Sequence, residues 1–260
     1  MGVLNVTPDS FSDGGLFLDP GTAVAQGRLL ASEGADVIDV GGESTRPGAD
    51  PVSVTEELER VVPVIEALAA EMRTPLSIDT SKAEVARAAL SAGASFVNDV
   101  TALRGDTAMA GVVADAQVEV CLVHMKGEPR TMQDDPRYDD VVGEVRAFLE
   151  ERLELAIGAG IAEQRVWLDP GIGFGKTLEH NLELIRRLDE IVAIGRPVVF
   201  GASRKRFLGR LTDRPEAERV AGTVAVNVLA LERGATMFRV HDVAATRDAL
   251  RVAGATLGLD

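Results

Sequence analysis

Eight short apolar runs, rich in β-branched residues, recur along the whole chain. They cover residues 2–6, 36–40, 76–79, 95–99, 118–124, 166–169, 197–202 and 237–240. Runs that are apolar throughout, without a polar residue at every second position, are typical of strands that are covered on both faces. Such strands belong to parallel sheets with helices packed on them. We therefore expect an α/β protein.

The segments between these runs show helical patterns with recognisable starts. Ser53 with Glu56, and Ser81 with Glu84, have the spacing of a capping box. In that motif a hydroxyl and a carboxylate satisfy the backbone N–H groups that the first helical turn leaves unpaired. Both pairs therefore predict helix starts.

The number of strand-and-helix units sets the fold class. Eight such units in 260 residues predict a TIM (β/α)8 barrel, and an open doubly wound sheet is the alternative. No low-complexity linker interrupts the series. Residues 1–260 are therefore predicted to form a single domain.

Charge and composition narrow the class of function. The formal net charge of −14 argues against non-specific nucleic-acid binding, which needs a broad basic surface. The one cysteine, Cys121, excludes an internal disulfide, fits a reducing compartment and has apolar neighbours that predict a place in the core. No apolar run reaches the ~20 residues of a membrane span, and no export leader is visible. We expect a cytoplasmic protein that binds neither nucleic acid nor membranes.

Polar residues gather at, or just after, the C-terminal ends of the predicted strands. They are Asn5, Asp39, Glu43 to Arg46, Asp79, Asn98, Asp99, His124, Asp169, Ser203 to Lys205, Arg239, His241 and Asp242. A single Asp at a strand end is usually a helix cap, and Asp242 fits that role. In a barrel, however, all these ends meet on one face, where the active sites of this fold lie. The pattern predicts an enzyme or a binding site for a polar ligand.

The last two predicted strands are followed by basic segments. These read "SRKRFLG" (203–209) and "RVHDV" (239–243). The loops after strands seven and eight are the common phosphate site of this barrel. Arg and Lys beside backbone N–H groups at a helix start form an anion pocket. We expect an anionic group to bind there.

Two other patterns could suggest a phosphate-binding loop or a zinc site, but neither meets the requirements of such a site. The segment "PGIGFGKT" (170–177) looks like a Walker A phosphate loop, but Pro170 stands where that motif needs its first glycine. The three His residues are scattered along the chain, so no His-based zinc site is predicted.

Two long loops have the composition of lids. The segments "NVTPDSFSDGG" (5–15) and "GGESTRPGADP" (41–51) are rich in Gly, Pro and Ser. Loops of this kind order over a ligand and exclude water. Phe11 either holds its loop down or stacks on a substrate, and Arg46 is expected to meet an anion.

Taken together, the motifs resemble those of the dihydropteroate synthase family from end to end. They are "MGVLNVTPDSFSDGG" (1–15), "DVGGESTRPGA" (39–49), "SIDTSK" (77–82), "VND" (97–99), "DPGIGFGK" (169–176), "SRK" (203–205) and "RVHDV" (239–243). The resemblance implies a pterin-binding barrel. It also implies that 6-hydroxymethyl-7,8-dihydropterin diphosphate condenses with 4-aminobenzoate to give 7,8-dihydropteroate and pyrophosphate.

The same resemblance implies roles for individual residues. The catalytic residues would be Asp79, Asp169, Lys205 and Arg46. The pterin would contact Asp79, Asn98, Met125, Asp169 and Lys205. The diphosphate would contact Thr45, Arg46, Arg239 and His241. Aminobenzoate would contact Phe11, Thr45, Arg46, Pro47, Phe174 and Lys205. A Mg²⁺ cofactor would be held through Asn5 and phosphate oxygens, as suits a metal that prefers oxygen ligands.

The resemblance further implies a homodimer and inhibition by sulfonamides. One departure is Arg206, which stands where many relatives have Ser. Two alternatives stay open. One is a methyltetrahydrofolate-dependent methyltransferase barrel of corrinoid systems, which would leave the anion-binding motifs unexplained. The other is a paralogue that binds pterin without turnover.

Overall fold

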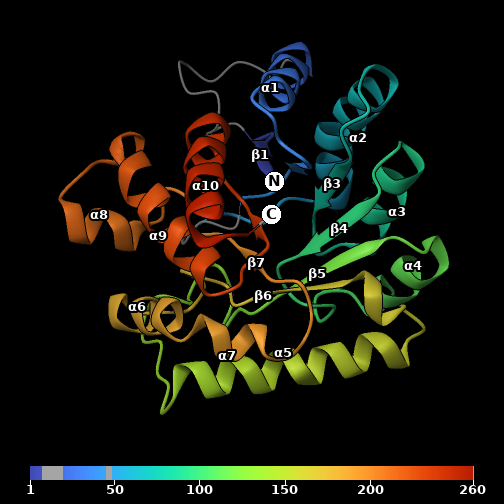
Figure 1. Ribbon diagram of the computed structural model, residues 1–260. Coiled ribbons are helices and arrows are strands. Elements are labelled where there is room, and N and C mark those ends of the chain that lie inside the picture. Colours follow the sequence, from blue (N-terminus) through green and yellow to red (C-terminus); the bar gives the residue numbers. More distant parts are fainter. Residues whose placement is uncertain (8–19, 45–48, 260) are drawn as a thin grey trace.

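The computed structural model describes residues 1–7, 20–44 and 49–259. Within these ranges, strands and helices alternate along the chain (Figure 1). The strands are β1 (Gly2–Asn5), β2 (Ile38–Gly41), β3 (Leu76–Asp79), β4 (Phe96–Asp99), β5 (Glu119–Val123), β6 (Val166–Asp169), β7 (Val199–Phe200) and β8 (Met237–Phe238). The helices are α1 (Pro20–Ser32), α2 (Val54–Glu71), α3 (Ala83–Ser91), α4 (Met109–Ala116), α5 (Val141–Gly158), α6 (Leu178–Arg186), α7 (Leu188–Val192), α8 (Arg206–Thr212), α9 (Val220–Glu232) and α10 (Val243–Leu257).

The strands close into a barrel. Strands β1 to β6 form one parallel sheet in chain order, and β7 pairs with β8. Single bridges join the two parts, from Leu168 to Val198 on one side and from Gly2 to Val240 on the other. At the second seam, the backbone N–H of Val3 donates to the Val240 carbonyl at 2.9 Å. The predicted TIM barrel is confirmed, and the open doubly wound sheet is excluded.

The apolar side chains form an outer and an inner core. The outer core lies between strands and helices and includes Ile38, Ile78, Val97, Leu122 and Leu168. The inner core fills the barrel and includes Val37, Phe96, Cys121, Val123 and Val199, packed against Trp167 and Met237. Neighbouring residues of one strand thus point to opposite sides, as the period of two requires. Cys121 is fully buried there, as predicted.

This alternation also places the polar residues. Asp39 follows Val37 by two positions, Asn98 follows Phe96, Asp169 follows Trp167, and Arg239 follows Met237. Each polar residue therefore shares the inward face with an inner-core side chain, one layer closer to the C-terminal end of its strand. The barrel thus has an apolar interior and a polar layer at one end.

The two predicted helix starts have different outcomes. The Ser53 side chain accepts a hydrogen bond from the Glu56 N–H, and α2 begins as expected. A helix also starts after Ser81, but the predicted cap is wrong, because Lys82 holds the N-cap position of α3 and no side-chain cap forms there. Its first N–H, that of Ala83, donates instead to the carboxylate of Asp106 from another loop, at 2.9 Å. A partner distant in sequence has replaced the local one.

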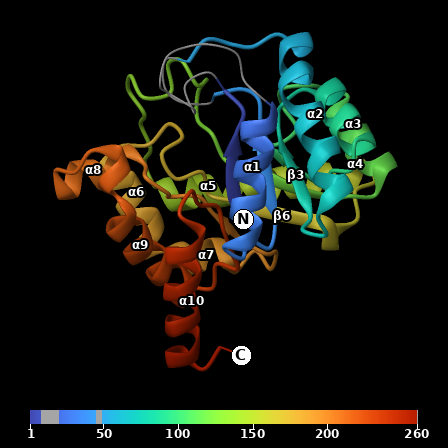
Figure 2. The ribbon, with the colours of Figure 1, turned by 90° about the horizontal axis from the view of Figure 1, so that it is seen from above.

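The loops after the strands lie together at one end of the barrel. In Figure 2 the connections that lead into α2 and α5 rise at the top, whereas the C-terminus lies at the bottom. No helix in the described part of the chain combines the length and apolarity that crossing a membrane would require.

Candidate active site

Arg239 is held between two carboxylates at the centre of the polar layer. Its Nε donates to Oδ2 of Asp39 at 2.6 Å, and its Nη2 donates to Oδ2 of Asp79 at 2.6 Å. The same oxygen of Asp39 accepts a hydrogen bond from Nδ2 of Asn98 at 3.0 Å. These residues come from β2, β3, β4 and the end of β8. The predicted residues Asp79, Asn98 and Arg239 therefore lie in one network.

Asp169 and Lys205 meet above Gly201. A Cβ atom on this glycine would lie 3.5 Å from Oδ2 of Asp169, 4.0 Å from Nζ of Lys205 and 3.9 Å from Cβ of Arg239. The lack of a side chain at Gly201 therefore leaves space between these three groups. The Lys205 ammonium lies 4.3 Å from the centre of the Phe174 ring and donates to the Ile172 carbonyl.

Burial shifts the pKa of the charged groups in this network. It raises the pKa of Asp79 to about 7, although Arg239 opposes the rise. It also raises the pKa of Asp169, against the effect of Lys205. Burial lowers the pKa of Lys205 to about 8, and Asp169 limits the fall. For Arg239 burial is the largest effect, but Asp39 and Asp79 outweigh it and raise its pKa. Perturbed groups of both signs at one rim are typical of a functional site.

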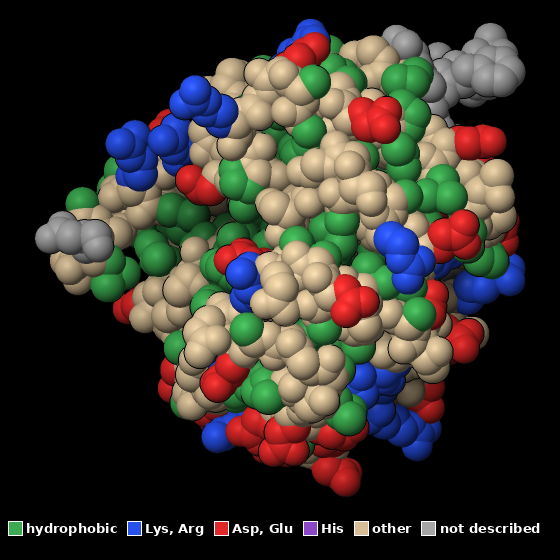
Figure 3. Space-filling model, turned by 90° about the vertical axis from the view of Figure 1, so that its right-hand side faces the viewer, with side chains coloured by type: hydrophobic (Ala, Val, Ile, Leu, Met, Phe, Trp, Pro, Cys, Tyr) green, Lys and Arg blue, Asp and Glu red, His purple; other side chains and the backbone are tan. Residues whose placement is uncertain are grey.

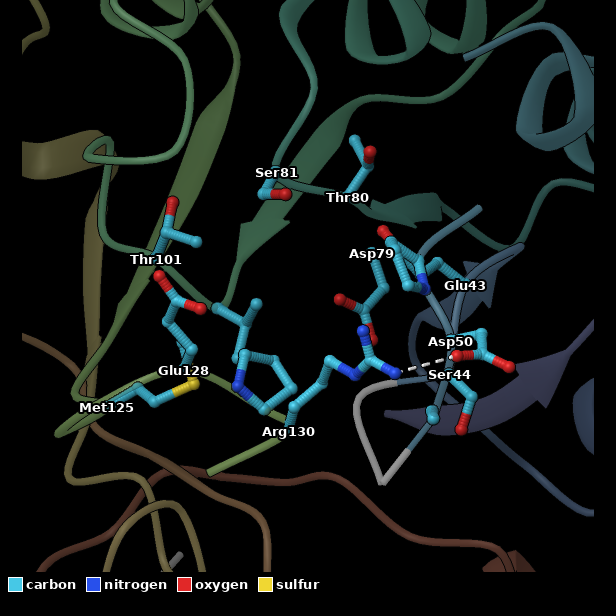
Figure 4. A pocket seen from close by; sticks show the side chains of 14 residues that line it. Glu43, Ser44, Asp50, Asp79, Thr80, Ser81, Thr101, Met125, Glu128 and Arg130 are labelled. Atoms are coloured by element: carbon cyan, nitrogen blue, oxygen red, sulfur yellow. Dashed lines mark hydrogen bonds and ion pairs between the residues drawn. The ribbon is translucent and has the colours of Figure 1, made fainter. Parts of the chain in front are cut away.

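A cavity of about 260 Å³ opens beside this network (Figure 4). Asp79 and Met125 line it, and so do loop residues after β2, β3, β4 and β5. In Figure 4 the Arg130 side chain crosses toward the β2 loop, where its Nη2 pairs with Asp50 at 3.1 Å. The structure thus brings the predicted pterin residue Met125 to the same opening as Asp79.

The basic segments after β7 and β8 offer fewer cations to an anionic ligand than the sequence suggested, because some of their side chains are bound within the protein. Arg204 forms two hydrogen bonds with Asp242, from Nε at 2.9 Å and from Nη2 at 2.5 Å. Asp242 occupies the N-cap position of α10, as predicted, but its carboxylate holds Arg204 and forms no capping hydrogen bond. His241 is hydrogen-bonded through Nδ1 to the Ser203 hydroxyl at 2.9 Å. Lys205, Arg239 and His241 remain as the candidate anion ligands of this region.

Asn5 lies at the rim, at the end of β1. A Cβ atom on Gly41 would be 3.7 Å from both Oδ1 of Asn5 and Oδ2 of Asp79. Both oxygen atoms thus lie near Gly41, and Oδ2 of Asp79 already accepts a hydrogen bond from Arg239. Among the described residues, no group of three or more His, Cys, Asp or Glu side chains could hold a metal ion. A cation at Asn5 would therefore need oxygen ligands from a substrate.

Four of the predicted residues cannot be placed. Phe11, Thr45, Arg46 and Pro47 lie outside the described ranges. Two residues that are placed at the site had no predicted role. Asp39 stands at a strand end, which was the only signal for it, and its full burial could not be predicted from that position. Arg130 follows β5 in a segment without a motif.

Comparison with known proteins identifies relatives of the whole chain. A family model described as "Pterin binding enzyme" matches residues 1–241. The chain is 48% identical to the dihydropteroate synthase of Escherichia coli K12, over 99% of this chain and 91% of the relative. Two solved structures are similar. A Xanthomonas albilineans dihydropteroate synthase with 4-aminobenzoic acid has a TM-score of 0.93, 53% identity and coverage of 100% and 93% of the two chains. A Yersinia pestis dihydropteroate synthase in a sulfonamide drug complex has a TM-score of 0.95, 45% identity and coverage of 99% and 93%.

The lowered pKa of Lys205 gives a testable pH dependence. In the folded protein the pKa of Lys205 is about 8, below the ordinary value of 10.5. Between these two pH values, Lys205 is therefore protonated mainly in the unfolded chain. The free energy of unfolding should therefore rise with pH across this window through Lys205. We expect the wild-type protein to gain stability relative to Lys205→Met between about pH 8 and about pH 10. Urea unfolding of both proteins measures this difference, and parallel pH curves would contradict it.

Proposed function

The chain belongs to the dihydropteroate synthases, among the pterin-binding enzymes, and on that premise we propose how its barrel rim performs their condensation. The reaction joins 6-hydroxymethyl-7,8-dihydropterin diphosphate to 4-aminobenzoate and releases pyrophosphate. The observation that carries the proposal is the convergence of Asp79, Asp169, Lys205 and Arg239 at one end of the barrel. Carboxylates that suit a heterocycle lie beside cations that suit its phosphates.

The pterin is proposed to bind through Asp169. Its Oδ1 accepts from the Gly171 N–H at 2.7 Å, while Oδ2 faces the space above Gly201. A pterin presents two neighbouring N–H donors at its amino-pyrimidinone edge, and a carboxylate can accept both in parallel. Asn98, Lys205 and Asp79 would complete the polar contacts. Met125 would form the apolar wall.

The diphosphate is proposed to lie over the end of β8, against Arg239 and His241. The bonds to Asp39 and Asp79 use two of the five N–H donors of the Arg239 guanidinium. The remaining donors can serve phosphate oxygens. The two carboxylates also fix the plane of the guanidinium before substrate arrives, so little reorganisation is needed. Thr45 and Arg46 join this set on sequence grounds alone.

In the proposed mechanism, the bond between the pterin methylene carbon and the diphosphate oxygen breaks first. Its electron pair leaves with pyrophosphate, where Arg239 and His241 stabilise the charge that develops. The carboxylates of Asp79 and Asp169 stabilise the cation left on the pterin. The amine of 4-aminobenzoate then forms the new C–N bond and loses a proton to pyrophosphate or water. No strong base is required.

The 4-aminobenzoate is proposed to bind near Phe174 and Lys205. The Lys205 ammonium lies over the Phe174 ring, so an apolar surface and a positive charge are adjacent there. Such a pair suits an aromatic carboxylate. Phe11, Thr45, Arg46 and Pro47 are proposed to complete this subsite. Sulfonamides should compete for it, as the complex of the Yersinia pestis relative suggests.

We propose Mg²⁺ as the cofactor. The Asn5 side-chain oxygen at the rim fits its preference for oxygen ligands, and substrate phosphates would supply others. When bound, the ion would add positive charge beside the phosphate oxygens. Asn5 would orient it.

Pyrophosphate release in a coupled assay tests the proposed function. We expect release that needs both 4-aminobenzoate and Mg²⁺ for full turnover, because capture of the pterin cation drives the reaction forward. Pterin binding without any release would indicate a silent paralogue. Methyl transfer from methyltetrahydrofolate would indicate the corrinoid-linked class of barrel.

Asp169→Asn tests the pterin pocket. The amide presents one acceptor and one donor in place of two acceptors, so one paired hydrogen bond is lost. The affinity for 6-hydroxymethylpterin should fall by about 10-fold to 100-fold, as expected for a charged hydrogen bond. Calorimetry measures the affinity, and Asp115→Asn at an exposed position is the matched control. Unchanged affinity in Asp169→Asn would reject the pocket assignment.

We also propose that the chain forms a homodimer through the face of α9 and α10. Two exposed apolar side chains, Val252 at 69% and Leu257 at 43% exposure, line a groove of about 610 Å³ there, and Leu229 of α9 is also exposed, at 42%. Val252→Glu should shift the protein from dimer to monomer in sedimentation analysis. Leu155→Glu, on the exposed face of α5, should leave the dimer intact. A wild-type monomer at working concentrations would refute the proposal.

Nucleic acid is not among the proposed partners. The net charge is −14, and the face shown in Figure 3 carries acidic and basic side chains interspersed. A cytoplasmic location is proposed, because the single buried thiol of Cys121 suits a reducing compartment.

A further inference from the structure

Lys176 is a buried lysine that the proposed reaction does not use. Its residue exposure is only 3%. Its Nζ lies 2.8 Å from Nδ1 of His124, 2.9 Å from the Gly171 carbonyl and 3.0 Å from the Phe174 carbonyl. Protonated Lys176 has three N–H donors, which match these three acceptors, and burial lowers the pKa of this ammonium well below its usual range. Burial lowers the pKa of His124 to about 2, so its ring is neutral and can accept at Nδ1.

The segment 170–176 curls around this ammonium. Gly171, Gly173 and Gly175 all have positive φ, of 67°, 83° and 64°, which L side chains rarely adopt. A Cβ on Gly171 would lie 1.8 Å from the His124 carbonyl oxygen, and one on Gly175 would lie 2.2 Å from that of Lys126. The segment therefore packs directly on the backbone that follows β5. The Lys176 side chain lies on the inside of this segment and donates hydrogen bonds to its carbonyl groups.

This segment in turn contacts both Asp169 and Lys205, the two charged residues beside Gly201. The Gly171 N–H donates to Oδ1 of Asp169 at 2.7 Å and so orients that carboxylate. The Ile172 carbonyl accepts from the Lys205 ammonium, and the Phe174 ring lies beneath it. Two of the three Lys176 acceptors belong to this segment. The chain of contacts from Lys176 to Asp169 and Lys205 is continuous.

We propose that Lys176 is a positioning residue for pterin binding, acting through segment 170–176 on Asp169 and Lys205. The inference rests on the proposed function, in which Asp169 and Lys205 contact the pterin. Lys176 does not itself contact phosphate or pterin, because its three donors are used inside the protein. A lysine that resembles the Walker A lysine thus has a different task here.

Lys176→Met tests the role by removing the three hydrogen bonds while keeping an unbranched side chain. The calorimetric dissociation constant for 6-hydroxymethylpterin should rise by about 10-fold or more, since a half-satisfied polar network loses its geometry. The KM for pterin diphosphate should rise as well, and so should the KM for 4-aminobenzoate, because Phe174 and Lys205 of its proposed subsite depend on the same segment. Loss of folded protein alone would lower apparent kcat and leave both KM values and the dissociation constant unchanged. That pattern would overturn the proposal.

The matched control is Lys126→Met. Lys126 lies in the loop after β5, and its ammonium donates to the Arg137 carbonyl and to Glu144, not to segment 170–176. This variant should retain the pterin affinity of the wild type. An equal loss of affinity in both variants would mean that the lysine charge, not the positioning, is responsible, and would overturn the proposal.

A second variant covers the case in which Lys176→Met does not fold. The half-buried Gln133 donates to the Gly173 carbonyl and supports the same segment from outside. Gln133→Ala should raise the pterin dissociation constant by a smaller factor, about 3-fold, since one neutral hydrogen bond is lost. Unchanged affinity there would refute action through the segment. Wild-type protein that binds pterin but releases no pyrophosphate would refute the proposed function alone.

Discussion

The ion pairs of Arg239 with Asp39 and Asp79 are the interaction on which the site depends. Three charges are placed at the end of an otherwise apolar barrel, where each would be costly alone. Asp39 is fully buried and accepts from both Arg239 and Asn98, so four strands are tied together by polar contacts at this level. A guanidinium fixed by two carboxylates is also oriented in advance of any ligand. In the proposed function, the same contacts that make the charges tolerable would also prepare the rim for a diphosphate.

Asp169 and Lys205 are organised in a different way. They are held largely by backbone groups, through the Gly171 N–H and the Ile172 carbonyl, and these belong to a segment closed around Lys176. One half of the site thus depends on side-chain ion pairs, and the other on the conformation of a glycine-rich loop. Gly201 lies between the halves, close to Asp169, Lys205 and Arg239, and in the proposed function the pterin would lie over it.

Much of this architecture could be predicted from the sequence. Eight apolar runs predicted the barrel, and polar residues at their ends predicted the rim that unites Asp79, Asn98, Asp169, Lys205 and Arg239. Contacts between distant residues could not be predicted. Asp106 caps α3 in place of Ser81, and Asp242 binds Arg204 in place of capping α10. A local motif indicates which hydrogen bonds a residue can form, but the tertiary fold determines which partner lies within reach. Lys176 was rightly excluded from a Walker A loop, yet its burial was not visible in the pattern.

The closure of the barrel has a consequence for its dynamics. Strands β7 and β8 have two residues each, and single bridges join them to β6 and β1, with backbone hydrogen bonds of Val240 to Met1 and Val3 beside the second bridge. So few ladder bonds make this seam the part of the wall where backbone amides should exchange with deuterium soonest, ahead of the β1–β6 sheet. Lys205 and Arg239 stand directly above it. A ligand that binds both cations would link the two sides of the seam. Ligand binding should therefore slow amide hydrogen exchange in the barrel wall itself.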